Sequence, residues 1–222
     1  NDDIVKISDK EYIYDKNLNL VKKKLLTFEG TSNDVMKGDY PHFMLKEINE
    51  EPDVINNILS FYTTDGAFNE NMPNFKKYKN IYFVGCGSAS YTADIAKKIF
   101  EKYADIKCEV FLASEFRYQK HFYDKKTLVI FISQSGETAD TLEALRITKN
   151  DGIDTLAIVN VVGSSIAREA KKVLYIKAGC EIAVATTKAF TAQYLLLVLI
   201  ALKMAGINAV SYTHLRAHET DS

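Results

Sequence analysis

Five short apolar runs follow one another along the chain from residue 81 onward, and a stretch with helical spacing follows each of them. The runs are rich in β-branched and aromatic residues, which favour strands, and they cover residues 81–87, 108–113, 127–133, 154–160 and 172–178. Strands that alternate with helices predict right-handed βαβ units around a parallel sheet. The sequence therefore predicts an α/β fold in three layers, with helices on both faces of a five-stranded parallel sheet. The expected helices run to residue 103 and over residues 114–119, 138–149, 164–170 and 188–204.

The part of the chain before residue 80 has a different pattern. Residues 3–26 alternate in short bursts with turn residues between them, which predicts two or three antiparallel strands. Because so few strands are not stable alone, we expect them to be the end of a larger domain. Residues 30–40 are polar and typical of a loop. Helical spacing then covers residues 43–62, and Pro52 divides this stretch into two predicted helices.

The two ends of the chain are unusual. The chain begins at Asn1 without a methionine, so we expect its start to lie inside a longer protein. The last stretch, "GINAVSYTHLRAHETDS", shows neither a helical nor a strand period, and it resembles translated sequencing-adapter read-through. On this interpretation residues 210–222 are a non-native tail. The spacing of His214 and His218 then indicates no metal site.

Composition excludes some classes of function. The chain has 222 residues, a net charge of −1, 47% hydrophobic residues and 26% charged residues, which is ordinary for a soluble globular protein. Near-neutral charge gives no electrostatic reason to expect a nucleic acid or an acidic membrane as a partner. The apolar run 194–202 is shorter than the ~20 residues that span a bilayer, and it predicts a buried helix. The three cysteines lack Cys-x-x-Cys spacing, which favours a reducing cytoplasm over disulfides or zinc.

Candidate chemistry gathers where predicted strands hand over to helices. In a parallel sheet, ligands bind beyond the carboxyl ends of the strands, so the candidate loops are 85–90, 133–138, 160–165 and 180–188. Helix N-termini offer unpaired backbone N–H groups and hold anions without a cationic side chain. The stretch "SQSGET" adds neutral side-chain donors and a glycine that permits close backbone approach. The sequence therefore predicts a phosphate site there, with donors from Ser133, Gln134, Ser135 and Thr138.

Two alternatives remain open at this point. Ser135 or Thr138 could only cap the following helix, and Glu137 in its first turn would compete with a phosphate unless it points away. "GCGSAS" resembles the dinucleotide motif G-x-G-x-x-G, but Ser90 replaces the third glycine. The nearest suitable acidic residue, Glu115, is too distant, and the sequence contains no P-loop motif.

Several longer motifs carry a family resemblance. "CGSAS", "SEFRY", "SQSGETADTLEALR", "NVVGSSIARE" and "AGCEIAVATTKAFTAQ" occur in this order. They resemble the first sugar-isomerase (SIS) domain of the glucosamine-6-phosphate synthase family, the isomerizing glutamine–fructose-6-phosphate aminotransferases. The upstream stretch "KGDYPHFMLKEINEEPDVI" resembles the linker that follows the glutaminase domain of these enzymes. The resemblance implies glutaminase strands over residues 1–27, linker and helices over 28–72, and the SIS domain over 73–209.

The resemblance also implies which residues bind the sugar phosphate. The family usually has Thr-Ser after Cys-Gly, whereas this chain has Ser88-Ala89. Ala89 therefore lacks the hydroxyl of the family's serine. Lys188 is a weaker candidate, because a lysine at a helix N-terminus needs an anion or another partner nearby. The implied substrate contacts are Cys86, Gly87 and Ser88 in the first loop, Ser133, Gln134, Ser135 and Thr138 in the second, and Val184, Ala185 and Thr186 in the third.

As a function, the resemblance implies the fructose 6-phosphate-binding part of an enzyme of amino-sugar biosynthesis. The intact enzyme would be a cytoplasmic homo-oligomer that makes glucosamine 6-phosphate and glutamate from fructose 6-phosphate and glutamine, with no metal or organic cofactor. The family's catalytic groups lie outside the matched region, so this chain alone is expected to bind without catalysis. The alternatives are a sugar-phosphate-sensing SIS module of a regulator and an ammonia-using sugar-phosphate isomerase or deaminase. The glutaminase-like strands and the linker favour the synthase.

Other singled-out residues have structural interpretations. Cys86 is expected to be a packing residue or a backbone contact rather than a nucleophile. Glu115 and Arg117 in "SEFRY" are expected to form an ion pair or an interface contact. Glu181 is a carboxylate near the sugar-lining loop without an assigned role, and it would be the first suspect if this chain contained a base.

Overall fold

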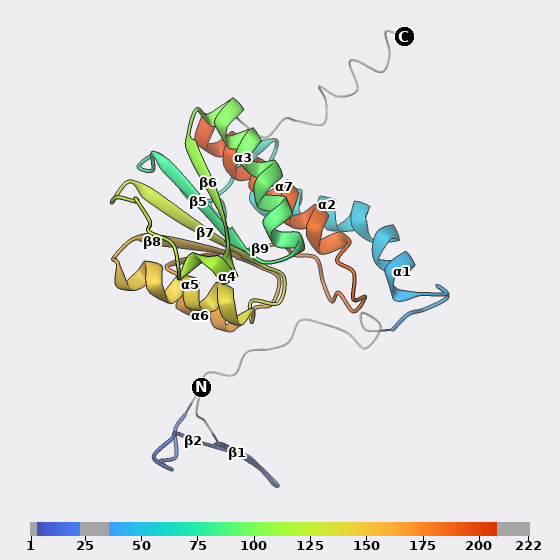
Figure 1. Ribbon diagram of the computed structural model, residues 1–222. Helices are drawn as coiled ribbons and strands as arrows, with labels where there is room; N and C mark the ends of the chain where they lie inside the picture. The colour runs from blue at the N-terminus through green and yellow to red at the C-terminus, as the bar shows by residue number, and fades with distance from the viewer. Residues whose placement is uncertain (1–3, 23–35, 208–222) are drawn as a thin grey trace. The chain divides into compact units, whose positions relative to one another are not determined.

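The computed structural model describes residues 4–22 and 36–207 (Figure 1). The chain divides into two compact units, Asn1–Ser32 and Asn33–Ser222. The first contains strands β1 (Ile4–Ile7) and β2 (Glu11–Tyr14), which pair antiparallel. Leu20 adds an isolated bridge to Tyr14. The antiparallel pattern expected for this segment is present, whereas the tail 210–222 with its two histidines lies outside the described residues.

The second unit is built on a sheet of five parallel strands, in the order β6-β5-β7-β8-β9. This confirms the predicted sheet. Every residue of β7 is buried, as expected for a central strand covered on both faces. The strands are β5 (Asn80–Gly85), β6 (Lys107–Leu112), β7 (Thr127–Ser133), β8 (Asp154–Val159) and β9 (Lys172–Tyr175).

Helices cover the two faces of the sheet and complete the three layers (Figure 1). Alternate residues of each strand point to opposite faces, so Ile81 and Phe83 enter one core while Tyr82 and Val84 enter the other. The first core contains α2 (Glu51–Tyr62), α3 (Ser88–Ala104) and α7 (Lys188–Ala205), and the second contains α4 (Ala113–Phe116), α5 (Ala139–Asn150) and α6 (Ser165–Glu169).

The helical segment before the sheet packs into this unit. Helix α1 (Phe43–Asn49) ends before Glu50, and Pro52 lies in the first turn of α2, where a missing N–H is tolerated. Helix α2 buries Val54, Ile58 and Tyr62. The Tyr62 hydroxyl accepts from the Tyr175 N–H and donates to the Tyr175 carbonyl, both at 2.9 Å. Residues 43–62 are thus fastened to the edge strand β9 and to α7.

A short hairpin was not predicted. Strands β3 (Thr63–Thr64) and β4 (Ala67–Phe68) pair antiparallel around Asp65 and Gly66. Both turn residues have positive φ, 50° and 77°, which is why Asp-Gly is a strong hairpin signal. The signal is present in the sequence, but the strands are too short to show a period.

Helix α7 carries the longest apolar stretch. By length and composition it is the one helix in the described part of the chain that could cross a membrane, and half of it is buried inside the protein. Leu196, Leu197, Leu199 and Ile200 belong to the first core, together with residues of β5, β7 and α3. The core helix of a soluble domain passes the same test of length and composition.

Candidate functional site

The strand order changes direction beside β5. The chain passes from β5 to β6 on one side and then to β7 on the other side, and helices α3 and α5 leave toward opposite faces. Such a switch leaves a crevice beyond the carboxyl ends of the two central strands. A cavity of about 220 Å³ opens there, lined by Cys86, Ser88, Ala89, Ile132, Ser133, Gln134, Ser135, Thr138, Thr186 and Gln193.

The cavity brings together residues from all three loops in which the sequence predicted substrate contacts. Three of the implied residues, Gly87, Val184 and Ala185, are not in its lining, and neither is the weaker candidate Lys188. Val184 is fully exposed. The lining also includes Ala89, Ile132 and Gln193, to which the sequence analysis assigned no contact. The implied residues that do line it are Cys86, Ser88, Ser133, Gln134, Ser135, Thr138 and Thr186.

The first loop connects β5 to α3, and at Gly85 the backbone of β5 comes close to the first turn of α3. A Cβ added at Gly85 would lie 3.2–3.3 Å from Ala89 and from the Ile132 carbonyl, so a larger residue would push α3 away from the sheet. Gly87 precedes α3 with φ 54°, a region that favours glycine. Cys86 lines the cavity and packs against the second core, consistent with the expected packing role.

The second loop, residues 133–138, is held by its own hydroxyls. The Ser133 hydroxyl accepts from the Gly136 N–H at 3.0 Å and shares a hydrogen bond with the Thr138 hydroxyl at 3.0 Å. The Ser135 hydroxyl accepts from the Glu137 N–H at 3.2 Å. Thr138 makes no side-chain capping bond to α5. The alternative that Thr138 only caps the helix is therefore wrong for its side chain.

Gly136 makes room for a neighbouring side chain. Its φ is 68°, and a Cβ at this position would lie 2.0 Å from the Ser164 hydroxyl oxygen. The Gly136 carbonyl accepts from the Ile166 N–H at 3.0 Å. The space that we expected for ligand approach is thus taken by Ser164, and the glycine fastens the second loop to the start of α6.

Glu137 is turned away from the cavity. Its Oε1 accepts from the Ser165 N–H at 2.7 Å, and the side chain is not part of the cavity lining. Hydrogen bonds from Ser165, helped by the nearby Arg168 guanidinium, hold the pKa of the Glu137 carboxyl below its usual range. The Glu137 carboxylate therefore accepts a hydrogen bond from α6, and it does not compete with an anion held by the second loop.

The third loop, residues 180–187, is held by carboxylates. Glu47 on α1 is only 1% exposed, and its Oε1 accepts from the Ile182 N–H at 2.6 Å and from the Ala183 N–H at 3.1 Å. Glu181 Oε1 accepts from the Thr187 N–H at 3.0 Å and from the Ala189 N–H at 3.1 Å. The amide groups of this loop and of the first turn of α7 are thus satisfied by two acidic side chains.

Lys188 pairs with Glu50, which lies between α1 and α2. Its Nζ, on a residue that is 3% exposed, lies 2.7 Å from Glu50 Oε2. Burial raises the pKa of Glu50, but Lys188 and Lys46 outweigh it, so the net pKa lies below the usual value. The weak candidate Lys188 is therefore an ion-pair residue that ties α7 to the preceding helices. The sequence signal that could have revealed this is the acidic run 47–51 on a predicted helix.

Burial dominates the electrostatics of Glu181. It raises the pKa of the carboxyl, the two N–H donors lower it, and the neighbouring Glu47 raises it further, with a net rise. Glu181 thus caps the start of α7 and does not line the cavity. This is a structural role for the carboxylate that the sequence left unassigned.

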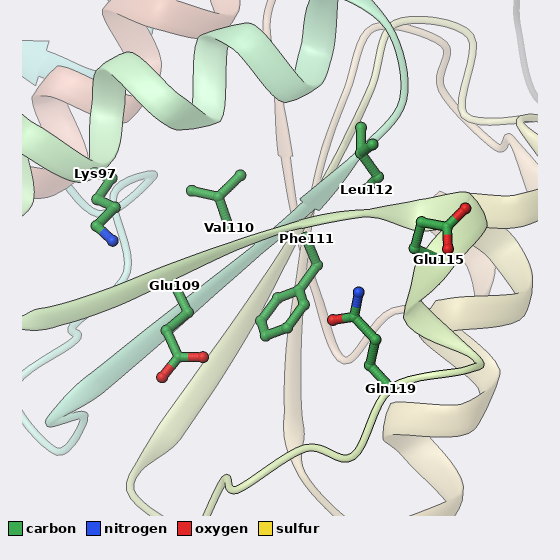
Figure 2. Close-up of a pocket in the computed structure, with 7 residues that line it drawn as sticks. All are labelled: Lys97, Glu109, Val110, Phe111, Leu112, Glu115 and Gln119. Atoms are coloured by element: carbon green, nitrogen blue, oxygen red, sulfur yellow. The ribbon is translucent and has the colours of Figure 1, made fainter.

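A larger hollow of about 410 Å³ lies along the edge strand β6. Its lining residues project to both sides of the strand, with Val110 and Lys97 on one side and Glu109 and Phe111 on the other (Figure 2). It is therefore an exposed sheet edge, and it contains none of the implied substrate residues. Glu115 lies here, whereas Arg117 pairs with Asp140 at 2.8 Å.

Other side chains that could carry chemistry are a buried thiol and the possible metal ligands. Burial raises the pKa of the Cys108 thiol to about 12, so it is not a nucleophile. Within residues 4–22 and 36–207, no three His, Cys, Asp or Glu side chains are grouped so that they could hold a metal ion.

Comparisons with known proteins place this geometry in a family. The model of the SIS domain matches residues 74–203. A glutamine–fructose-6-phosphate aminotransferase (isomerizing) from Bradyrhizobium diazoefficiens is 44% identical over 195 residues, which are 86% of this chain and 32% of the relative. Its counterpart from Fusobacterium nucleatum is 41% identical over 210 residues, 92% of this chain and 35% of the relative. The chain thus spans about a third of the length of these curated relatives.

Among solved structures, one is described as the C-terminal domain of glucosamine-fructose-6-phosphate aminotransferase from Francisella tularensis. It is 38% identical to this chain and has a TM-score of 0.73. The match covers 84% of this chain and 54% of the chain in that structure. Three observations support the same assignment: the order of the strands in the sheet, the cavity at the switch in strand order, and the match of the domain model. The chain belongs to the SIS domain family.

Proposed function

We propose that this chain is the fructose 6-phosphate-binding part of a glutamine-dependent aminotransferase and isomerase. The intact protein would make glucosamine 6-phosphate and glutamate, as a cytoplasmic homo-oligomer. The observation that carries the proposal is the hydroxyl-rich cavity at the switch in strand order, with Glu137 turned away from it. The names of the curated relatives support the choice of substrate.

The phosphate is proposed to lie against residues 133–138. Among the described residues, the cavity lining contains no lysine, arginine or histidine, so neutral donors must hold the anion. Hydroxyl and backbone N–H donors near the start of α5 can do so, since hydrogen bonds to a charged acceptor are stronger than neutral ones. The Ser135 hydroxyl is the clearest donor, because it only accepts a bond from the Glu137 N–H and keeps its own proton available.

The same lining contains no aspartate or glutamate within the described part of the chain. Moving a proton between adjacent sugar carbons needs a placed base, whose absence typically costs a factor of about 10²–10⁴. We therefore expect the 222-residue chain to bind fructose 6-phosphate without converting it. Deuterium incorporation at the first carbon of the sugar in deuterated water, followed by NMR, would contradict this expectation.

Ser135→Ala tests the proposed phosphate contact. Loss of one hydrogen bond to a charged group should weaken fructose 6-phosphate binding by about 1.5–3 kcal/mol, measured by calorimetry. Fructose without a phosphate should bind far more weakly than fructose 6-phosphate to the unmodified chain. Ser60→Ala is a matched control, because this serine is exposed on α2 and lies outside the cavity lining. Equal affinities of the Ser135→Ala variant and the unmodified chain would contradict the assignment.

A further inference from the structure

One side chain in the cavity lining has an unusual environment. Gln193 lies on α7, is 1% exposed and lines the cavity, and its Oε1 has no hydrogen-bond partner among the described residues. An unpaired buried carbonyl oxygen destabilises the folded state, because it has lost its hydrogen bonds to water. A leucine or methionine at this position would avoid that penalty. The contacts within the protein therefore do not explain why an amide side chain occupies this position.

The neighbours of Gln193 in the lining do not meet this need. Ala89 and Ile132 are buried and apolar. Ser133 is buried too, but its hydroxyl is already engaged with Gly136 and Thr138. No group of the described residues pairs with the Gln193 oxygen, so a hydrogen-bond donor on a bound ligand can do so.

The dianionic phosphate group of a sugar phosphate cannot supply that donor, because its three terminal oxygens are acceptors. A sugar hydroxyl can donate to the amide oxygen. The two ends of a sugar phosphate thus match two parts of the cavity, with donors on the 133–138 loop and an acceptor on α7. This division rests on the proposed function.

We infer that Gln193 binds a hydroxyl of the sugar and distinguishes a sugar phosphate from a bare phosphate. The amide is a binding residue for the sugar, while residues 133–138 bind the phosphate. A site built to pair a hydroxyl rejects ligands that lack it, since the buried polar group is then left unpaired.

The test is the variant Gln193→Met, which keeps the size of the side chain and removes the amide. Affinities for fructose 6-phosphate and for inorganic phosphate are measured by calorimetry on the 222-residue chain, with thermal unfolding in parallel. The expected result is a loss of about tenfold in fructose 6-phosphate affinity, unchanged phosphate affinity, and an unfolding temperature no lower than that of the unmodified chain. Leu196→Met is the control, because Leu196 is buried on the same helix outside the cavity lining.

Two results would overturn the inference alone. If Gln193→Met binds fructose 6-phosphate as the unmodified chain does, the amide oxygen does not meet the sugar. If the variant unfolds earlier and loses affinity for both ligands equally, the amide is structural. If the unmodified chain does not bind fructose 6-phosphate, the proposed function fails, and the inference fails with it.

Discussion

The two loops that face each other across the cavity are stabilised in opposite ways. Residues 133–138 have three hydrogen bonds among themselves, all within five residues of one another, and further bonds link them to residues 160–166. Residues 180–187 depend on Glu47, which is 135 positions away from Ile182 along the chain. The bonds that hold residues 133–138 therefore stay within a short stretch of the chain. Residues 180–187 have local bonds from Glu181, but they also depend on α1.

This difference bears on function. The proposed phosphate loop is bounded by β7 and α5 and is bonded to the start of α6, whereas Thr186 reaches the cavity from a loop that α1 also holds. Glu50 and Glu51 add two more bonds from the same helical segment, to Lys188 at 2.7 Å and to the Thr191 hydroxyl at 3.0 Å. The segment that the sequence assigned to a linker is thus a support for one wall of the cavity.

The largest expected effect comes from Gly136→Ala in the local loop. The new Cβ would collide with the Ser164 hydroxyl, and alanine is unfavourable at φ 68°. Backbone strain and overpacking together should lower the free energy of unfolding by about 3 kcal/mol, measured by urea unfolding. Gly206→Ala is the matched control, because Gly206 has φ 74° but nothing within 4 Å. It should lose only about 1 kcal/mol. Equal losses would show that Ser164 yields without penalty.

Glu47→Ala should break the distant support of the other loop. It leaves the Ile182 and Ala183 N–H groups without their acceptor, so we expect a loss of about 2 kcal/mol in unfolding free energy. Hydrogen exchange at these two amides should accelerate, while exchange at Gly136 should stay slow. Glu47→Gln keeps an acceptor oxygen and should be milder. Glu109→Ala, on the edge strand β6, is the surface control. Unchanged exchange at Ile182 would contradict the proposed support.

Ser133→Ala is the reciprocal experiment in the local loop. It removes the acceptor of the Gly136 N–H and the partner of the Thr138 hydroxyl. A loss of about 1 kcal/mol in unfolding free energy is expected, with faster exchange at Gly136 and no change at Ile182. If exchange accelerates at both amides, the two loops are coupled and the contrast between them does not hold.

The smallest effect is expected for Glu181→Gln, and it should depend on pH. Because the folded chain raises the pKa of Glu181, it binds this proton more tightly than the unfolded chain does. The contribution of Glu181 to stability therefore falls as pH rises from the ordinary glutamate pKa through the raised value, and the penalty is fully present above it. Glutamine keeps an acceptor for the Thr187 and Ala189 N–H groups without the charge. The variant should be more stable by roughly 0.5 kcal/mol at pH 7, with no advantage in acid. A pH-independent difference would contradict this.

Much of the fold could be predicted because its signals are local. The strands of the sheet are largely apolar runs, and the longer helices show their own period, so five parallel strands could be predicted without a template. The β3–β4 hairpin was missed because two-residue strands carry no period, although Asp65 and Gly66 form a recognisable turn. Ser133, Ser135 and Thr138 of the second loop could be predicted to lie together, because they are close together in the sequence.

What the sequence by itself determined is the set of short-range features: the strands, the helices, the glycines at the turns and the hydroxyls that follow β7. Only the tertiary structure decided which charged groups meet. It paired Lys188 with Glu50, turned Glu137 toward Ser165 and placed Glu47 under the third loop. It also left the oxygen of Gln193 unpaired beside the cavity. Periodicity reports burial of a residue relative to its neighbours in the chain, whereas a hydrogen-bond partner 135 positions away depends on how whole elements pack.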